Sequence, residues 1–129
     1  MGTNKTIALI AHDGKKAEMI DFVKENYNQL KKFNLVATGT TGKRITETGL
    51  HVECKLSGPN GGDAQIAAMA AEKLLSAVLF FRDPLGKHPH EPDIQMLMRI
   101  CDVHDVPLAT NPNAAKLILL GLESIDLNK

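Results

Sequence analysis

Short apolar runs alternate along this chain with segments whose apolar residues recur at helical spacing. The runs have the length of β-strands and cover residues 7–11, 34–37, 51–56, 77–81 and 106–109. Between the first two runs, apolar residues recur three or four positions apart and charged residues fill the remaining positions, at Met19, Val23, Tyr27 and Leu30. This spacing predicts one amphipathic surface helix.

The same helical spacing returns after two aspartates. Apolar residues repeat after Asp63, at Ile66, Met69, Ala70 and Leu74, and after Asp93, at Ile94, Leu97, Met98 and Cys101. We therefore expect two further helices to begin at these aspartates. Asn111 and Pro112 supply an N-cap and a first-turn proline for a last helix, which we expect to end near Gly121.

Strands that alternate with helices favour right-handed crossovers and a parallel sheet covered on both faces. The fold class predicted is α/β, a single-domain three-layer sandwich with a five-stranded, mostly parallel sheet. The runs at 7–11 and 77–81 are almost uniformly apolar, which places them at the centre, whereas 51–56 alternates polar and apolar residues, as a peripheral strand does. In such sheets ligands bind beyond the carboxyl ends of the strands.

Composition narrows the class of protein. A chain of 129 residues with 43% hydrophobic residues fits one domain, residues 1–129. Lysine and arginine number 15, as do aspartate and glutamate, so the formal charge is zero and nucleic acid is not an expected partner. Because no run reaches the roughly 18 apolar residues of a membrane span and no leader pattern is present, we expect a cytoplasmic protein. Cys54 and Cys101 lie in apolar patterns and are expected to act as small hydrophobic residues rather than as a disulfide.

Polar and charged residues cluster where the predicted strands end. The segments concerned are His12-Asp13, Thr38 to Gly42, Ser57 to Asp63, Asp83 to Asp93 and Thr110-Asn111. Thr38, Gly39, Thr40, Thr41 and Gly42 combine three hydroxyls with two glycines and the amides that open a helix, a combination suited to a phosphate group. Lys16, one turn into the first helix, lies within reach and adds positive charge. The segment matches neither a Walker A motif nor GxGxxG, so nucleotide binding is not indicated.

Asp63 closes a glycine-rich loop between a strand pattern and a helix pattern. Glycines at 58, 61 and 62 let the backbone approach a ligand, and amides near a helix start favour anionic groups. A carboxylate among such donors suggests a base that takes a proton from a phosphorylated substrate. The helix start lowers the pKa of this carboxylate and weakens it as a base, whereas burial in a closed site raises the pKa.

Each of these interpretations has a plainer alternative. Asp63 and Asp93 are both placed where an N-cap is common. Thr40 and Thr41 are equally placed to cap the short helix that contains Ile45, and Lys16 to be one charge on a solvated helix face. A metal site built from His88, His90, Glu91 and Asp93, with His12 and Asp13 adding ligands, is a further alternative, although the spacing matches no familiar metal signature.

Several blocks along nearly the whole chain resemble the methylglyoxal synthase family. Their order, spacing and strand-end placement agree jointly: Ala11-His12-Asp13 with Lys16, Ala37 to Gly42, Leu56-Ser57-Gly58-Pro59, Gly61 to Gln65, Asp83-Pro84-Leu85 and Pro89 to Asp93. The resemblance implies conversion of dihydroxyacetone phosphate to methylglyoxal and inorganic phosphate, without a metal or organic cofactor.

The resemblance also implies a role for individual residues. Asp63 matches the catalytic aspartate and His90 the active-site histidine. His12 would contact substrate, Lys16 and Thr38, Gly39, Thr40 and Thr41 would hold phosphate, Ser57 and Gly58 would supply further donors, and Asp13, Asp83 and Asp93 would support them. Relatives commonly form homohexamers that inorganic phosphate inhibits. Many continue into a C-terminal arm that reaches a neighbouring subunit, and the sequence up to Lys129 leaves that arm short or missing.

Two other classes of protein share this layout. The same fold serves as a ligand-sensing module that binds a phosphorylated effector and catalyses nothing. Retention of Asp63 and His90 favours the enzyme. A phosphoryl-accepting receiver domain also has five strands and an acidic residue after the first, but Ser57-Gly58 stands after the third strand where the acceptor aspartate is needed.

Overall fold

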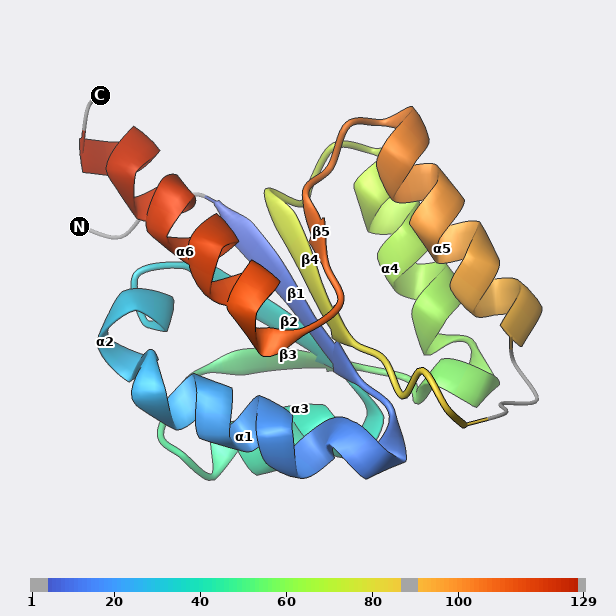
Figure 1. Cartoon of the computed structure of the whole chain (residues 1–129), viewed down its shortest axis with the longest axis horizontal. Coiled ribbons are helices and arrows are strands. Elements are labelled where there is room, and N and C mark those ends of the chain that lie inside the picture. The colour runs from blue at the N-terminus through green and yellow to red at the C-terminus, as the bar shows by residue number, and fades with distance from the viewer. Residues whose placement is uncertain (1–4, 87–90, 128–129) are drawn as a thin grey trace.

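A computed structural model describes residues 5–86 and 91–127 as a five-stranded sheet flanked by helices (Figure 1). The strands are β1 (Thr6–Ala11), β2 (Asn34–Thr38), β3 (Val52–Lys55), β4 (Ala77–Phe81) and β5 (Leu108–Ala109), in the order β3-β2-β1-β4-β5. Every strand pair is parallel, with Leu9 facing Ala37 of β2 and Leu79 of β4. The predicted α/β class is confirmed, with β1 and β4 inside the sheet and β3 at one edge.

Helices cover both faces of the sheet. They are α1 (Lys16–Glu25), α2 (Tyr27–Leu30), α3 (Gly39–Thr46), α4 (Gly62–Ala71), α5 (Glu91–Val103) and α6 (Pro112–Leu127), with short 3-10 turns η1 (Asp13–Lys15) and η2 (Gly58–Asn60). In Figure 1, α1, α2, α3 and α6 lie on one face and α4 and α5 on the other. Because successive strand residues point to opposite faces, Leu9 joins the first hydrophobic cluster and Ala8 and Ile10 join the second. This explains why β1 and β4 are apolar without alternation.

The first predicted helix is wrong in one respect, because two helices occupy its place. Asn26 separates α1 from α2 and is almost completely buried. Its side-chain amide donates to the Phe22 carbonyl at 2.8 Å, and its side-chain oxygen accepts from Lys116 Nζ of α6 at 3.0 Å. The break is therefore held by a residue far along the chain.

The last helix also differs from its prediction, since α6 continues past Gly121 to Leu127. A Cβ atom built at Gly121 would meet nothing within 4 Å, so this glycine is an interior helix residue rather than a stop. The start of α6 is as predicted. Asn111 Oδ1 accepts from the Ala114 amide at 2.9 Å, which is an N-cap bond, and Pro112 is the first helical residue.

The two helices expected to start at aspartates begin earlier. Helix α4 begins at Gly62 behind Gly61, and α5 begins at Glu91, so Asp63 and Asp93 lie inside the first turn. Cys54 is also a correction, because its side chain is exposed on β3 rather than packed in the core. Cys101 is buried, and both thiols are free. In the part of the chain that the structure describes, no helix is long and apolar enough to cross a bilayer.

Candidate active site

A cavity of about 290 Å³ opens at the carboxyl end of β1, on the face covered by α4 and α5. Its lining includes five of the residues that the sequence singled out: His12, Asp13, Ser57, Gly58 and Asp63. Ile10, Ala11, Pro59 and Phe80 supply the apolar wall. Larger cavities of about 500 and 510 Å³ lie elsewhere, so size alone would not have identified this one.

Asp63 is buried in this cavity, with 1% of its surface exposed. The N-cap position of α4 belongs to Gly61, whose φ of +113° favours glycine, and no side chain caps the helix. The interpretation of Asp63 as an N-cap is therefore wrong. A Cβ at Gly62 would lie 2.0 Å from the Leu56 carbonyl oxygen, so glycine is required for the backbone to turn this tightly.

Gln65 ties the entry of this loop to the helix behind it. Its side-chain oxygen accepts a hydrogen bond from the Leu56 amide at 2.9 Å. The Ser57 carbonyl accepts from the amides of Asn60 and Gly62, at 3.0 and 2.8 Å. These bonds fix the backbone on both sides of Ser57. No function was predicted for Gln65, although it ends the block Gly61 to Gln65, which the sequence singled out.

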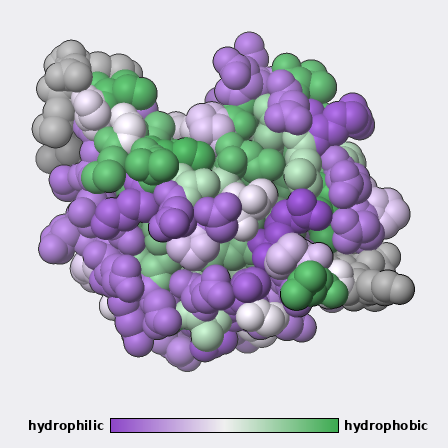
Figure 2. Space-filling model, viewed as in Figure 1, coloured by the Kyte–Doolittle hydropathy of each residue, from purple (hydrophilic) through white to green (hydrophobic). Residues whose placement is uncertain are grey.

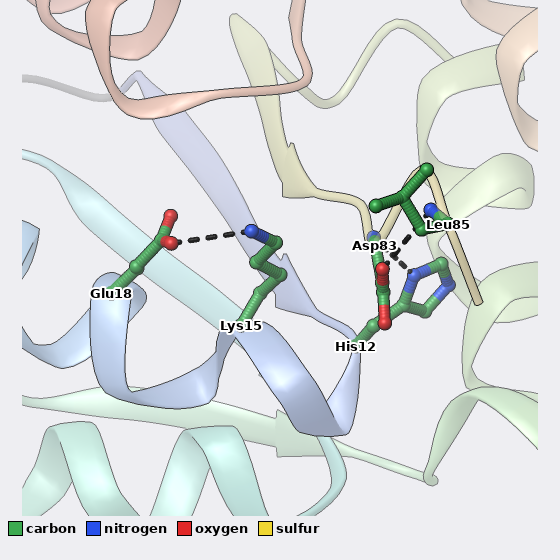
Figure 3. Close-up of polar contacts among 5 residues, drawn as sticks. All are labelled: His12, Lys15, Glu18, Asp83 and Leu85. Carbon is green, nitrogen blue, oxygen red and sulfur yellow. Dashed lines mark hydrogen bonds and ion pairs between the residues drawn. The ribbon is translucent and has the colours of Figure 1, made fainter.

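His12 lines the cavity, and its imidazole is held in a defined orientation. Its Nδ1 atom accepts a hydrogen bond from the Asp83 amide at 2.9 Å (Figure 3). Because an accepting nitrogen carries no hydrogen, the neutral ring holds its proton on Nε2. The ring packs edge-on against Phe80 with centroids 5.1 Å apart. Asp83 thus supports His12 through its backbone amide, while its carboxylate accepts from the Leu85 amide at 3.1 Å.

The segment Thr38 to Gly42, called the threonine segment below, lies beside the cavity and approaches its rim at Ser57. Thr38 ends β2, and α3 opens at Gly39, whose φ is +56°. A Cβ at Gly39 would lie 3.2 Å from Ser57 Cα, so the two loops are in close approach. Thr38 occupies the N-cap without a side-chain bond, and Thr40 and Thr41 lie within the helix, so neither threonine is its cap. The Thr41 hydroxyl is buried and has no hydrogen-bond partner within the described residues.

Lys16 joins this segment to the start of α1. Its Nζ atom donates to Thr40 Oγ1 at 2.5 Å and lies 2.8 Å from Asp13 Oδ1. The Lys16 side chain is 19% exposed, whereas that of Asp13 is 97% exposed. Lys16 is therefore not a charge on a solvated helix face. Its ammonium is held at the end of β2, where the sequence placed the anion-binding segment.

Some of the residues singled out in the sequence do not join the cavity. Asp93 lies in the first turn of α5 and is not among the described residues of the lining. His88 and His90 lie outside the described residues. Across residues 5–86 and 91–127, no three histidine, cysteine, aspartate or glutamate side chains are grouped as metal ligands would be.

Comparison with known proteins identifies the class of protein to which this fold and this site belong. Residues 18–110 match the family model described as an MGS-like domain. The chain is 55% identical over 122 residues to the methylglyoxal synthase of Borreliella burgdorferi strain ZS7, covering 94% of this chain and 97% of that protein. It is 57% identical over 122 residues to the methylglyoxal synthase of Geobacillus thermodenitrificans strain NG80-2, covering 94% and 85%.

A solved structure agrees with these relatives. The crystal structure of methylglyoxal synthase from Elizabethkingia anophelis NUHP1 matches with a TM-score of 0.84 and 42% identity, over 92% of this chain and 79% of that one. The chain therefore belongs to the methylglyoxal synthase family and is an enzyme of the lyase class.

Proposed function

We propose that this chain converts dihydroxyacetone phosphate to methylglyoxal and inorganic phosphate, acting as a carbon–oxygen lyase. The observation that carries the proposal is the meeting of Asp63 and His12, both buried, in one cavity beside the segment Thr38 to Gly42. A carboxylate and an imidazole held together away from bulk water suit the removal of a proton next to a carbonyl group. Membership of the methylglyoxal synthase family supports the same reaction.

Asp63 is the proposed base. Its carboxylate takes a proton from the hydroxymethyl carbon, and the electron pair of the broken C–H bond forms the carbon–carbon double bond of an enediolate. The enediolate then expels the phosphate from the neighbouring carbon, which breaks the C–O bond and leaves the neutral enol of methylglyoxal. This enol gains a proton on its terminal carbon and loses the proton on its oxygen, which gives methylglyoxal. Burial of Asp63 keeps competing water away from the enediolate.

His12 is the proposed donor to the oxygen on which negative charge develops. Because the Asp83 amide donates to Nδ1, the hydrogen of the neutral ring lies on Nε2, and this N–H is the proposed donor. One preorganised donor of this kind typically contributes about 10²- to 10³-fold in rate. His90, by family resemblance, protonates or hydrogen-bonds a second oxygen, and it lies outside the described residues.

The phosphate of the substrate is assigned to the segment between β2 and α3. Lys16 supplies positive charge there, and Thr38, Gly39, Thr40 and Thr41 supply hydroxyls and the amides at the start of α3. The buried Thr41 hydroxyl offers a donor that no described residue uses. Ser57 and Gly58 line the path from this segment to Asp63 and add further donors. Asp13 holds Lys16, and Asp83 holds His12, as supporting residues.

We also propose that copies of this chain assemble, as a hexamer by family resemblance, and that inorganic phosphate inhibits as well as leaving as product. Apolar side chains of α6 support association, because Leu117, Leu120 and Ile125 are 71%, 46% and 52% exposed. Figure 2 shows hydrophobic atoms gathered over α6 at the upper left. A contiguous exposed apolar surface is typical of a protein–protein contact. A cytoplasmic location is proposed from the same resemblance.

Incubation of the purified chain with dihydroxyacetone phosphate tests the proposed reaction. We expect methylglyoxal and inorganic phosphate to appear in equal amounts, well above the rate of substrate kept without protein. A chelator is expected to leave the rate unchanged, whereas strong inhibition by it would revive a metal at the segment that contains His88 and His90. Binding of the substrate without either product would instead favour the alternative, a sensing module that binds a phosphorylated effector.

A further inference from the structure

Gln65 lies near the start of α4, and its side chain reaches back to the chain that enters the loop 57–61. Pairing between β2 and β3 ends at Lys55. Leu56 is the next residue, and its amide donates to Gln65 Oε1 at 2.9 Å instead of to a strand carbonyl. At the far end of the loop, the Gln65 amide donates to the Gly61 carbonyl at 3.0 Å. One residue therefore holds both ends of the loop.

The bond at Leu56 bears on Asp63 through backbone contacts. The Leu56 carbonyl oxygen lies so close to Gly62 that a Cβ at that position would overlap it. The Ser57 carbonyl accepts from the Gly62 amide at 2.8 Å. Because Gly62 directly precedes Asp63, a shift of the peptide between Leu56 and Ser57 moves the backbone that carries the proposed base.

Ser57 also stands in close approach to the threonine segment. A Cβ at Gly39 would lie 3.2 Å from Ser57 Cα, so the position of Ser57 sets the spacing between the proposed base and the phosphate end of the site. The threonine segment itself is held from another direction, because Lys16 of α1 donates to Thr40 Oγ1. Loss of the bond at Leu56 should therefore move the base and leave the phosphate end in place.

Water has access to the bond between Leu56 and Gln65. Leu56 is 54% exposed and Gln65 is half-buried. In a variant without the side-chain oxygen, water can hydrogen-bond to the Leu56 amide, so the fold does not depend on this bond. A water molecule is not attached to α4, however, and it cannot hold the peptide at a fixed distance from the helix. We expect loss of the oxygen to loosen the loop 57–61 without unfolding the chain.

We propose that Gln65 is a positioning residue for the conversion of dihydroxyacetone phosphate, an inference that rests on the function proposed above. Its side-chain oxygen fixes the peptide between Leu56 and Ser57, and this peptide places Asp63 against the hydroxymethyl carbon of the substrate. Gln65 is not among the described residues that line the cavity, so it acts through the backbone and not by touching the substrate. A reacting group misplaced by about 1 Å can cost about 10²-fold in rate.

Two substitutions separate the hydrogen-bond acceptor from the bulk of the side chain. Gln65→Met puts a methyl group where the oxygen stands, and Gln65→Glu returns an oxygen that accepts the Leu56 bond. Gln29→Met is the matched control, because Gln29 is also half-buried and belongs to α2, on the other face of the sheet. Thermal unfolding establishes that each variant is folded.

Steady-state kinetics with dihydroxyacetone phosphate then measure the effect. We expect Gln65→Met to lower kcat about 10- to 100-fold while KM stays within about threefold, because the phosphate end keeps its contacts. Gln65→Glu and Gln29→Met should keep kcat within about threefold of wild type. A residue that served only the stability of α4 would not show this rescue by an acceptor oxygen.

Hydrogen exchange of the Leu56 amide follows the same bond without substrate. We expect faster exchange in Gln65→Met and exchange as in wild type in Gln65→Glu. A wild type that makes neither product would refute the proposed reaction and the inference with it. With an active wild type, the inference alone is overturned if Gln65→Met keeps its kcat, if Gln65→Glu is as slow as Gln65→Met, or if the Leu56 amide exchanges equally in all three proteins.

Discussion

Gly62→Ala is expected to damage both the fold and the candidate active site through one contact. A Cβ at this position would lie 2.0 Å from the Leu56 carbonyl oxygen and 2.9 Å from that of Ser57. Ordinary van der Waals contact begins near 3.4 Å, so the backbone must move by 3.4 − 2.0, or 1.4 Å, to relieve the closer contact. Because both atoms belong to backbone, no side chain can rotate away. The shift also stretches the 2.8 Å bond from the Gly62 amide to the Ser57 carbonyl.

The loss of stability follows from the close backbone contact and from the stretched hydrogen bond. Overpacking typically destabilises by about 1 to 3 kcal/mol and a lost hydrogen bond by about 0.5 to 1.5 kcal/mol, so the free energy of unfolding should fall by about 1.5 to 4.5 kcal/mol. For a chain of this size the melting temperature should drop by about 10 °C. Turnover of dihydroxyacetone phosphate should fall as well, because Asp63 follows Gly62 directly.

Gly121→Ala is the matched control for thermal unfolding. A Cβ there meets nothing within 4 Å inside α6, so the same substitution should stabilise by about 0.5 to 1 kcal/mol through helix propensity. Calorimetry and the turnover assay on both variants provide the comparison. A Gly62→Ala protein that melts with the wild type and keeps its turnover would refute the close-approach argument.

Three further changes have effects that the structure predicts. Lys16→Met should raise KM for dihydroxyacetone phosphate roughly 10- to 100-fold in steady-state kinetics, because a charged donor at Thr40 is lost; an unchanged KM would remove Lys16 from the phosphate site. Asn111→Ala should lower the free energy of unfolding by about 1 kcal/mol, the usual worth of an N-cap, and equal stability in urea titrations would contradict the cap. Burial, with a smaller contribution from Asp102, raises the pKa of Cys101 to about 11. The unfolded thiol therefore ionises first, and stability should decline between about pH 9 and pH 11; in Cys101→Ala this decline should be smaller, and an equal decline would assign it to other groups.

Much of the architecture was predictable from local pattern. Buried parallel strands need unbroken apolar runs, and those runs identified all five strands, their parallel pairing and the edge position of β3. The strands predicted at 51–56 and 106–109 are longer than β3 and β5, because residues next to a strand end resemble strand residues without pairing. The N-cap of α6 was correct since Asn111 and Pro112 act through bonds within one helical turn.

What could not be predicted depends on distant partners. The break at Asn26 is held by Lys116, ninety positions away, and no local pattern encodes that bond. The start of α4 at Gly62 follows from contact with the Leu56 backbone, which left Asp63 inside the helix instead of capping it. The orientation of His12 likewise depends on the Asp83 amide.

The candidate site was identified by placing polar residues at the carboxyl ends of strands. That rule brought His12, Ser57 and Asp63 to one cavity, as expected for a parallel sheet. It could not give the Lys16 contact with Thr40, because the direction of a long side chain depends on tertiary packing. Asp93 was grouped with the site by family resemblance, and the described lining of the cavity does not include it.

The central claim is that the buried carboxylate of Asp63 removes the substrate proton. The most direct measurement compares turnover of dihydroxyacetone phosphate at saturation by wild type, Asp63→Asn and Asp21→Asn, the last being the same change at an exposed position on α1. Thermal unfolding of each variant establishes that it is folded. We expect Asp63→Asn to lose about 10²- to 10⁴-fold in kcat and Asp21→Asn to remain within twofold of wild type. A folded Asp63→Asn protein that turns over as fast as wild type would contradict the account.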